Sequence, residues 1–317
     1  MFDETVVLNF TANSATLTVP SNERHDGTAG TGVRVVVSVN DKYLDLNCPA
    51  TQVLIVEWLE WDHNNKKLSN ANGHASVLVR DGKAHLLNCI VHDLNDTSYS
   101  ATAIHLSPGS PGDEGQILSC IIYDVLAQAG SANIGANGIR SVNLASTPSR
   151  NIQNNTIHNV QTYGGTDDAN GIFNQADNSG LNLQNNIVTD TSSFGGVGAD
   201  YVGTFTLATA DHNLSSDATA SGTGSLTSKT SANQFVSTVG GSEDLHLKAG
   251  ADAIDAGTDL GTTPSGVEID IDGRDRDAEG DAWDMGADEL VVIGGPFPHH
   301  IRRAQSLSGG LIGIGGL

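Results

Sequence analysis

Short apolar runs recur along this chain at a nearly constant interval. Four segments align without gaps: HLLNCIVHDL (85–94), QILSCIIYDV (116–125), NIQNNTIHNV (151–160) and NLQNNIVTDT (182–191). Between them lie further short apolar segments and turns rich in Gly, Asn and Asp, which favour tight turns for backbone reasons. No segment of helical period is long enough to cross back over a sheet. The pattern therefore predicts a chain of short strands joined by turns.

The alignment defines a repeat of 31 to 35 residues. The equivalent positions, one in each repeat, are Trp58, Cys89, Cys120, Asn155 and Asn186. A repeat of this length made only of short strands indicates a solenoid or a propeller. A propeller blade needs antiparallel hairpins, and the two-residue turn signals of such hairpins are scarce here. The spacing instead matches one coil of a parallel β-helix with modest turn insertions.

Stacked coils place equivalent residues in columns roughly 4.8 Å apart. Cys89 is therefore expected next to Cys120, as a buried column of thiols rather than a disulfide or a metal site, because small thiols are common core residues. Asn155 is expected next to Asn186, where side-chain amides can satisfy one another along the stack.

The pattern changes after about residue 205. The stretches DHNLSSD (211–217), QFVSTVGGSEDLHLKAGADAIDAG (234–257) and DIDGRDRDAEGDAWDMGADEL (270–290) resemble the C-terminal choice-of-anchor Q type module of secreted and surface β-helix proteins of the pectate-lyase-like superfamily. The chain departs from that family's pattern at Ala251-Asp252, where the family favours Ser-Pro, and at Met285 and Asp288. The resemblance implies a right-handed parallel β-helix and implies almost nothing about a reaction, because function resides in sites rather than in folds.

The predicted fold class is therefore all-β: a right-handed parallel β-helix solenoid with an N-terminal β cap and a C-terminal extension. A solenoid end exposes unpaired strand edges and needs such a cover. The expected division is an N-terminal β cap over 1–50, β-helix coils over 51–204, a C-terminal β-helix module and cap over 205–290, and an attachment tail over 291–317.

Composition narrows the possible partners. The chain has 317 residues and a formal net charge of −22. Because an acidic body repels phosphate, nucleic acid is not expected as a partner. No apolar run approaches the roughly 18 residues of a membrane span. Three cysteines cannot form a disulfide framework, so at least one stays unpaired.

Acidic residues are the only candidates for catalysis. Glycoside hydrolysis needs two carboxyl groups roughly 5–10 Å apart, which neighbouring coils could supply from Asp167, Asp168 and Asp200. The stretch EWDH (60–63) faintly resembles a pectate lyase motif but lacks the arginines that follow it there. The simpler interpretation is that these are solvated turn residues. No catalytic residue and no cofactor-binding residue is assigned, and an enzyme is the less favoured reading.

A second group of acidic residues could hold a cation. They are Asp270, Asp272, Asp275, Asp277, Glu279, Asp281 and Asp284. Their oxygens suit a hard cation such as calcium, but the spacing is not that of an EF-hand and two nearby arginines can neutralise part of the cluster. Calcium stays open as a cofactor, and no metal ligand is assigned.

Residues 291–317 are predicted to be an attachment element, because they contain no acidic residue and end in an apolar, Gly-rich stretch. The residues expected to make the attachment are Phe297, Arg302, Arg303, Leu311, Ile312 and Ile314. Burial of such a segment commonly comes with a closed homo-oligomer.

The first residues lack the basic and apolar regions of a secretion signal, so we expect none. A β-helix that acts outside the cell without export fits a virion protein released by lysis, and reduced cysteines fit that origin. The favoured function is thus a non-enzymatic structural protein of a phage particle, a capsid decoration or tail component that contacts other virion proteins. The alternatives are a lyase or glycoside hydrolase acting on an extracellular glycan, and an exported adhesin at the cell surface.

Overall fold

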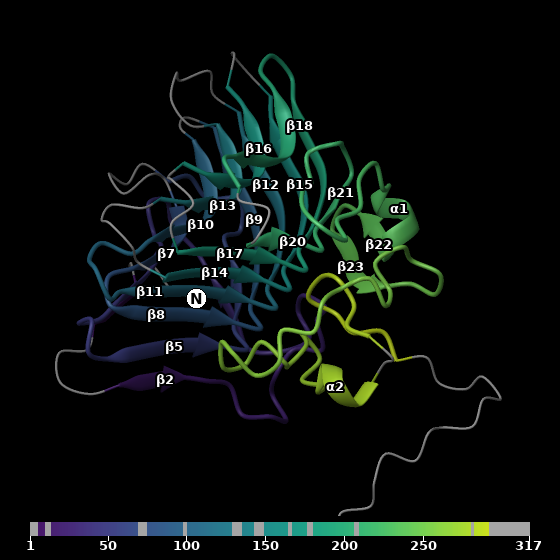
Figure 1. Ribbon diagram of the computed structural model, residues 1–317. Coiled ribbons are helices and arrows are strands. Elements are labelled where there is room, and N and C mark those ends of the chain that lie inside the picture. The colour runs from purple at the N-terminus through teal and green to yellow at the C-terminus, as the bar shows by residue number, and fades with distance from the viewer. Residues whose placement is uncertain are drawn as a thin grey trace, which may run out of the picture.

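In the computed structural model the chain winds into stacked coils whose strands form three parallel β-sheets (Figure 1). The structure describes residues 6–9 (backbone only), 14–68, 75–97, 100–128, 135–142, 149–163, 167–175, 180–205, 209–279 and 282–291. Each coil contributes one strand to each sheet, and neighbouring strands in the three sheets run parallel. The fold is a parallel β-helix, which confirms the fold class predicted from the repeat.

Each of the three sheets has seven strands. Sheet 1 contains β1 (Val6–Asn9), β4 (Leu44–Asn47), β7 (Ala75–Arg80), β10 (Ala101–Ser107), β13 (Ala136–Ser141), β16 (Ala169–Asn174) and β19 (Gly198–Gly203). Sheet 2 contains β2 (Ala15–Leu17), β5 (Val53–Glu57), β8 (Lys83–Leu87), β11 (Glu114–Leu118), β14 (Ser149–Gln153), β17 (Leu181–Gln184) and β20 (Ala210–Asp211). Sheet 3 contains β3 (Arg34–Val36), β6 (Glu60–Asp62), β9 (Ile90–Asp96), β12 (Ile121–Ala127), β15 (Thr156–Thr162), β18 (Ile187–Ser193) and β21 (Leu214–Ser215).

Columns of aliphatic side chains fill the interior of the coils. Residues of equal register in neighbouring strands point inward together, so each sheet supplies its own column. These columns are Val77, Ile104, Ile139 and Ile172 from sheet 1, Leu86, Ile117, Ile152 and Leu183 from sheet 2, and Val91, Ile122, Ile157 and Val188 from sheet 3. All are at most 1% exposed. Branched side chains pack well on a pleated surface, which explains why this composition favours strands.

The predicted Cys–Asn column exists, with one correction. The amide N–H of Cys120 donates to Asn155 Oδ1 (3.0 Å), and that of Asn155 donates to Asn186 Oδ1 (3.1 Å), so these residues lie on successive coils. Cys89 and Cys120 are buried and unbonded, as predicted. The prediction for Trp58 is wrong. Glu60 pairs with Ile90, which places Leu59 beside Cys89, because that coil has 30 residues rather than 31.

Trp58 belongs instead to the corner between sheets 2 and 3. This corner has a residue of left-handed φ in each coil: Trp58, Asn88, Ser119, Asn154, Asn185 and His212. Asparagine adopts this conformation more readily than most residues. Its side chain also remains free to bond outside the coil. Asn154 Nδ2, for example, donates to the carbonyl of Val267 (2.8 Å).

The C-terminal segment packs along this corner. After β21, residues 216–226 turn back across the last coil, where Leu226 bridges Leu214. Residues 231–290 then run along the outside of sheets 2 and 3 (Figure 1). They contain α1 (Ser231–Gln234), β22 (Phe235–Val239), β23 (Ser242–Leu247) and α2 (Arg276–Glu279), and β22 and β23 form an antiparallel hairpin.

Outward-facing apolar residues hold this segment against the coils. Ile90, Ile121 and Ile187 of sheet 3 belong to one cluster with Phe235, Leu245, Met285 and other residues of the segment. Leu87 and Leu118 of sheet 2 pack with Val267 and Trp283 in another. The segment therefore covers the side of the β-helix, and its role as a C-terminal cap stays a prediction.

The strands within residues 1–50 join the same three sheets as the later coils: β1 pairs with β4, β2 with β5 and β3 with β6. This range thus supplies a first coil, and its role as an N-terminal cap stays a prediction. Among the described residues, no helix has the length and apolar character required to cross a bilayer.

Candidate functional site

In sheet 3, each of the four central strands carries an Asp or Asn at the same position. Asp93, Asp124, Asn159 and Asp190 each adopt a left-handed φ between 53° and 59° in the middle of their strands. The residue before each and the residue after each pair in regular register with the next coil. Asp and Asn tolerate this conformation better than other non-glycine residues. The result is a column of carboxylate and amide groups on the outer face of the sheet.

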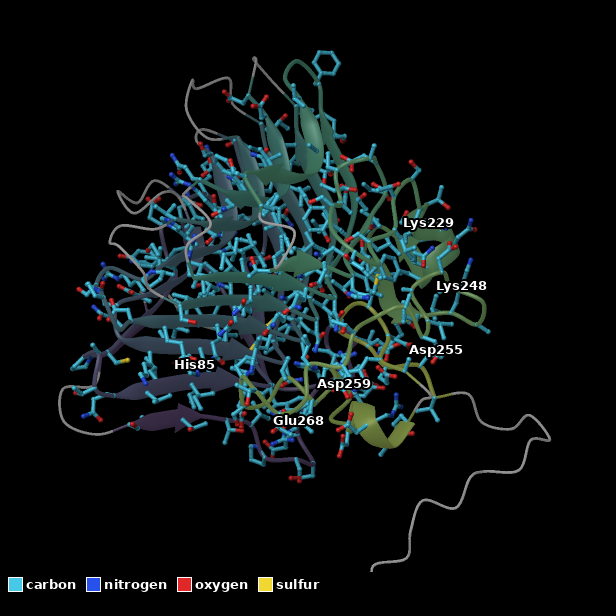
Figure 2. The ribbon with its side chains drawn as sticks, in the orientation of Figure 1. His85, Lys229, Lys248, Asp255, Asp259 and Glu268 are labelled. Atoms are coloured by element: carbon cyan, nitrogen blue, oxygen red, sulfur yellow. The ribbon has the colours of Figure 1, made fainter. Side chains whose placement is uncertain are left out.

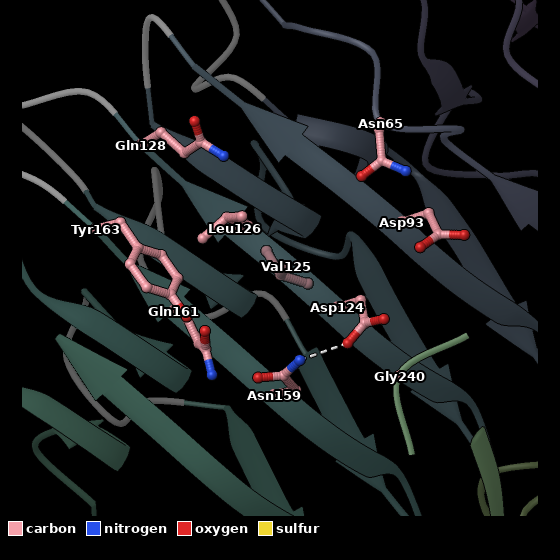
Figure 3. A pocket seen from close by; sticks show the side chains of 10 residues that line it. All are labelled: Asn65, Asp93, Asp124, Val125, Leu126, Gln128, Asn159, Gln161, Tyr163 and Gly240. Carbon is pink, nitrogen blue, oxygen red and sulfur yellow. Dashed lines mark hydrogen bonds between the residues drawn. The ribbon is translucent and has the colours of Figure 1, made fainter. Parts of the chain in front are cut away.

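A groove of about 540 Å³ runs over this column (Figure 3). Its lining residues are Asn65, Asp93, Asp124, Val125, Leu126, Gln128, Asn159, Gln161, Tyr163 and Gly240. Gly240 lies in the turn of the β22–β23 hairpin, so the C-terminal segment forms one wall. Within the groove, Asn159 Nδ2 donates to Asp124 Oδ1 (2.5 Å), which aligns the polar groups of two coils.

Two exposed aromatic side chains follow the strands of sheet 3. Tyr163 is 58% exposed and lines the groove, and Phe194 is 83% exposed. The amide of Tyr163 donates to Ala127 O (2.9 Å), and that of Phe194 donates to Thr162 O (3.0 Å). The two aromatic residues therefore occupy equivalent positions in successive coils. Large apolar side chains left in water at adjacent positions commonly mark a binding surface.

The groove is acidic. Asp93 and Asp124 line it, and Glu243 of β23 lies close to Asp124. Burial and the neighbouring Asp124 carboxylate raise the pKa of Glu243. No lysine or arginine is among the described residues that line this groove. Like charges repel, so the groove disfavours anionic ligands.

His92 holds Asp93 at the edge of the groove. Its Nδ1 lies 3.1 Å from Asp93 Oδ2, and its Nε2 lies 3.0 Å from Oε1 of the fully buried Glu60. The ring also stacks on Tyr123 with the centroids 4.9 Å apart. Burial lowers the pKa of His92, but the hydrogen bonds to Asp93 and Glu60 outweigh it and raise that pKa to about 9. The imidazolium therefore donates from both nitrogens and orients Asp93.

This geometry predicts a loss of stability at alkaline pH. The pKa of His92 in the folded chain, about 9, exceeds the ordinary value near 6.5. The ion pairs of His92 thus contribute stability that is complete below about pH 6.5 and is lost as the pH rises through about 9. We expect the free energy of unfolding, measured in urea, to fall between pH 7 and 9.5. The variant His92→Gln should show a shallower fall over that interval, and an unchanged slope would contradict the assignment.

The carboxylates considered first for catalysis do not converge. Asp168 is exposed and accepts a hydrogen bond from the Val197 amide (2.8 Å), while Asp167 precedes it in the same turn. Asp200 is 1% exposed and accepts from Ser216 N (2.6 Å) and Ser216 Oγ (2.8 Å), so it anchors the turn across the last coil. These contacts are those of turn residues.

The EWDH stretch is also structural. Glu60 is fully buried and accepts from the amide of Gly30 (2.6 Å). Trp61 Nε1 donates to Ser76 Oγ (2.9 Å), which in turn lies 2.9 Å from Nδ1 of the buried His63. Burial lowers the pKa of His63 to about 4, so the ring is neutral inside the coil.

The acidic run of residues 270–289 folds around one buried cation, Arg276. Its guanidinium donates to Glu289 Oε2 (3.1 Å) and to the carbonyls of Gly286 (2.9 Å) and Ala287 (2.8 Å). The carboxylates of Asp270 and Asp284 accept hydrogen bonds from backbone amides. These oxygens thus already have protein partners.

Two groups of described residues place three potential metal ligands close together: Asp62, His92 and Asp93, and His246, Asp272 and Asp288. In both groups the histidine is flanked by carboxylates on its two ring nitrogens. A doubly protonated ring donates hydrogen bonds and has no lone pair for a metal. The geometry is therefore that of an ion pair.

The predicted attachment residues lie outside the described part of the chain: Phe297, Arg302, Arg303, Leu311, Ile312 and Ile314. The groove on sheet 3 was not predicted, although its column could have been found. Asp93, Asp124, Asn159 and Asp190 occupy the same position of the four aligned segments. The sequence around Gly240 contains no comparable repeat that would place this turn at the wall of the groove.

The fold and the groove define a parallel β-helix protein with an acidic, aromatic-edged groove on one sheet. No model of a known protein family matches the chain, and no curated protein matches it.

Proposed function

We propose that this chain is a non-enzymatic structural β-helix protein that binds a glycan in the groove on sheet 3. The observation that carries the proposal is the pairing of exposed Tyr163 and Phe194 with the polar column beside them. The apolar C–H face of a sugar ring packs on an aromatic ring, and amide and carboxylate groups exchange hydrogen bonds with its hydroxyls. A repeating ligand suits a repeating surface.

The charge of the site narrows the ligand. Because Asp93 and Asp124 line the groove without a lysine or arginine among the described lining residues, a sulfated or uronic-acid polymer would be repelled. The expected ligand is an uncharged or amine-bearing polysaccharide.

The larger assembly remains a proposal from the sequence. We place the protein in a phage particle, as a capsid decoration or tail component attached through residues 291–317, with exported adhesin at a cell surface as the alternative. The acidic body and the tail without acidic residues support this arrangement. The likeness of residues 205–290 to a choice-of-anchor Q type module belongs to the same proposal. Detection of the chain by mass spectrometry in purified particles tests it, and its absence from them favours the adhesin.

Removal of the groove aromatic should abolish most of the binding. Aromatic contacts contribute on the order of 1–3 kcal/mol, so Tyr163→Ala is expected to weaken affinity for the ligand at least tenfold. Isothermal titration calorimetry with neutral polysaccharides measures this. Leu17→Ala, at an exposed residue of sheet 2, is the control and should leave affinity unchanged.

Two outcomes would overturn the proposal. Equal affinities of Tyr163→Ala and the parent chain would remove the groove from binding. Release of reducing ends from the polysaccharide, lost in Asp124→Asn, would favour the alternative of a glycoside hydrolase. That alternative has one specific observation behind it, the raised pKa of Glu243 beside Asp124, which suits a general acid.

A further inference from the structure

The outer face of sheet 2 carries a second groove, of about 770 Å³, on a different side of the molecule. Its floor is formed by β8, β11, β14 and β17, and one wall is the segment 259–265 of the C-terminal extension. Figure 2 labels His85 on the floor and Asp259 on that wall. The groove on sheet 3 shares no lining residue with it.

The floor is built from stacked polar side chains. One column contains His85, Gln116, Asn151 and Asn182, and the next outward column contains Gln153 and Gln184. Asn182 Nδ2 donates to Asn151 Oδ1 (2.7 Å). In such a ladder the amide N–H groups donate to the side chain of the next coil, and the side-chain oxygen at the end of the ladder is left without a donor.

Neighbouring carboxylates fix the direction of two of these amides. Gln184 Nε2 donates to Asp211 (3.1 Å to Oδ1), because a carboxylate can only accept. Gln184 Oε1 therefore accepts from Gln153 Nε2 (2.9 Å), which leaves Gln153 Oε1 as the end of the chain. In the same way Gln116 Nε2 donates to Glu114 Oε1, so Gln116 Oε1 points away from Glu114 and is left without a donor.

Among the described residues, these atoms have no hydrogen-bond partner. Gln116 Oε1, Gln153 Oε1 and His85 Nε2 are buried without a hydrogen bond, and their residues are 3%, 3% and 8% exposed. An unpaired buried polar atom is costly, and native chains keep few of them unless a ligand or water completes the site. Three of them line one groove. Burial also lowers the pKa of His85 to about 4, so its ring is neutral.

We infer that this groove is a second binding site, and that it takes an uncharged oligosaccharide. The two amide oxygens require hydrogen-bond donors, which hydroxyl groups supply. No lysine or arginine is among the described residues that line this groove, and Nζ of Lys83 on β8 lies 4.0 Å from Oε2 of Glu114. The floor therefore offers an anionic ligand no cation. Ile55, Leu260 and Pro264 add apolar surface for the C–H faces of the sugar rings.

The ligand lies along the axis of the β-helix, across the strands. Successive coils present side chains of equal register roughly 4.8 Å apart, so a chain of repeating units meets a polar side chain of the floor at each step. Gln116 and Gln153 lie on adjacent coils and bind neighbouring units of one chain.

Titration of the full chain with a panel of neutral hexasaccharides, α- and β-linked glucose, mannose, galactose and xylose, tests this inference. Gln116→Met and Gln153→Met keep the side-chain volume and remove the unpaired oxygen, together with the amide that donates to Glu114 or to Gln184. Each is expected to weaken affinity for the bound hexasaccharide at least tenfold. Leu17→Ala, at an exposed residue of sheet 2 that lines neither groove, is the control and should keep this binding event.

Thermal melting separates a binding role from a structural one. Each Met variant loses one unpaired oxygen and one hydrogen bond, to Glu114 or to Gln184, and these two effects oppose each other. The variants should therefore melt close to the temperature of the parent, and should lose the ligand-induced rise. The inference would be overturned if no hexasaccharide of the panel binds the parent chain. It would also be overturned if the two Met variants bind as tightly as the parent. So would variants that melt lower than the parent with unchanged affinity. Loss of binding only in Tyr163→Ala would leave the groove on sheet 3 as the single site.

Discussion

Replacement of Asn186 by alanine is expected to lower the free energy of unfolding by about 4 kcal/mol, because each buried group left unpaired costs about 1–3 kcal/mol. Asn186 Nδ2 donates to the carbonyls of Ile152 (2.8 Å) and Gln184 (3.1 Å) and to Asn213 Oδ1 (3.0 Å). Its Oδ1 accepts from both the amide and the side chain of Asn155. The substitution removes these five hydrogen bonds from the buried interior. The carbonyl of Gln184, Oδ1 of Asn213 and Nδ2 of Asn155 each keep one other partner.

Chemical denaturation in urea measures this effect, and the same column supplies the control. Cys120 occupies the equivalent position two coils earlier and is fully buried. Because its thiol is a weak hydrogen-bonding group, Cys120→Ala removes little more than volume and should cost about 1 kcal/mol. A cost of Asn186→Ala no larger than that of Cys120→Ala would show that the amide ladder does not stabilise the stack.

Replacement of Arg276 by methionine is expected to destabilise the C-terminal segment by about 3–5 kcal/mol, the usual effect of breaking a buried ion pair on one side. Arg276 is 1% exposed, and its removal takes a charged donor away from Glu289 and from the carbonyls of Gly286 and Ala287. Burial already raises the pKa of Glu289. We expect residues 231–290 to open while the coils stay folded, because the aliphatic columns of the interior lie in a separate cluster.

Hydrogen exchange detects this difference directly, as faster exchange in residues 231–290 than in the strands of the three sheets. Arg274→Met is the matched control. Arg274 is 40% exposed at its side chain and pairs with Asp272 (2.6 Å), and an exposed pair is worth at most about 1 kcal/mol. Equal exchange in the two variants, or loss of protection in the coils with Arg276→Met, would contradict this account.

Opening of the C-terminal segment should also weaken the proposed glycan binding, since Gly240 forms a wall of the groove on sheet 3 and residues 259–265 form a wall of the groove on sheet 2. The stability of this segment and the integrity of both grooves are thus linked.

The repeat was predictable from the sequence because it is local. Apolar residues that recur every 31 to 35 positions need neighbours above and below to bury them, so the columns of Cys120, Asn155 and Asn186 followed from alignment alone. The error at Trp58 has the same origin. The spacing of 31 residues was applied to the coil before Cys89, which has only 30 residues. A shift of one residue along a strand exchanges the inward and outward faces.

The chemistry of the grooves was only partly predictable. Asp93, Asp124 and Asn159 share one position of the repeat, but Asp and Asn also dominate ordinary turns, so type alone does not distinguish a lining residue from a turn residue. The unpaired oxygens of Gln116 and Gln153 depend on the direction of hydrogen bonds that Glu114 and Asp211 impose. No spacing along the chain reveals that direction.

The sequence by itself determined that short strands stack in coils, that at least one of the three cysteines stays unpaired, and that the body is acidic. Tertiary structure alone decided where the C-terminal segment lies. Ile90 and Val91 are adjacent and both apolar, yet Val91 faces the interior while Ile90 contacts the segment from outside. Both faces of such a strand are equally hydrophobic in the sequence. Which face becomes core and which becomes a docking surface depends on packing between residues more than a hundred positions apart, such as Asn154 and Val267.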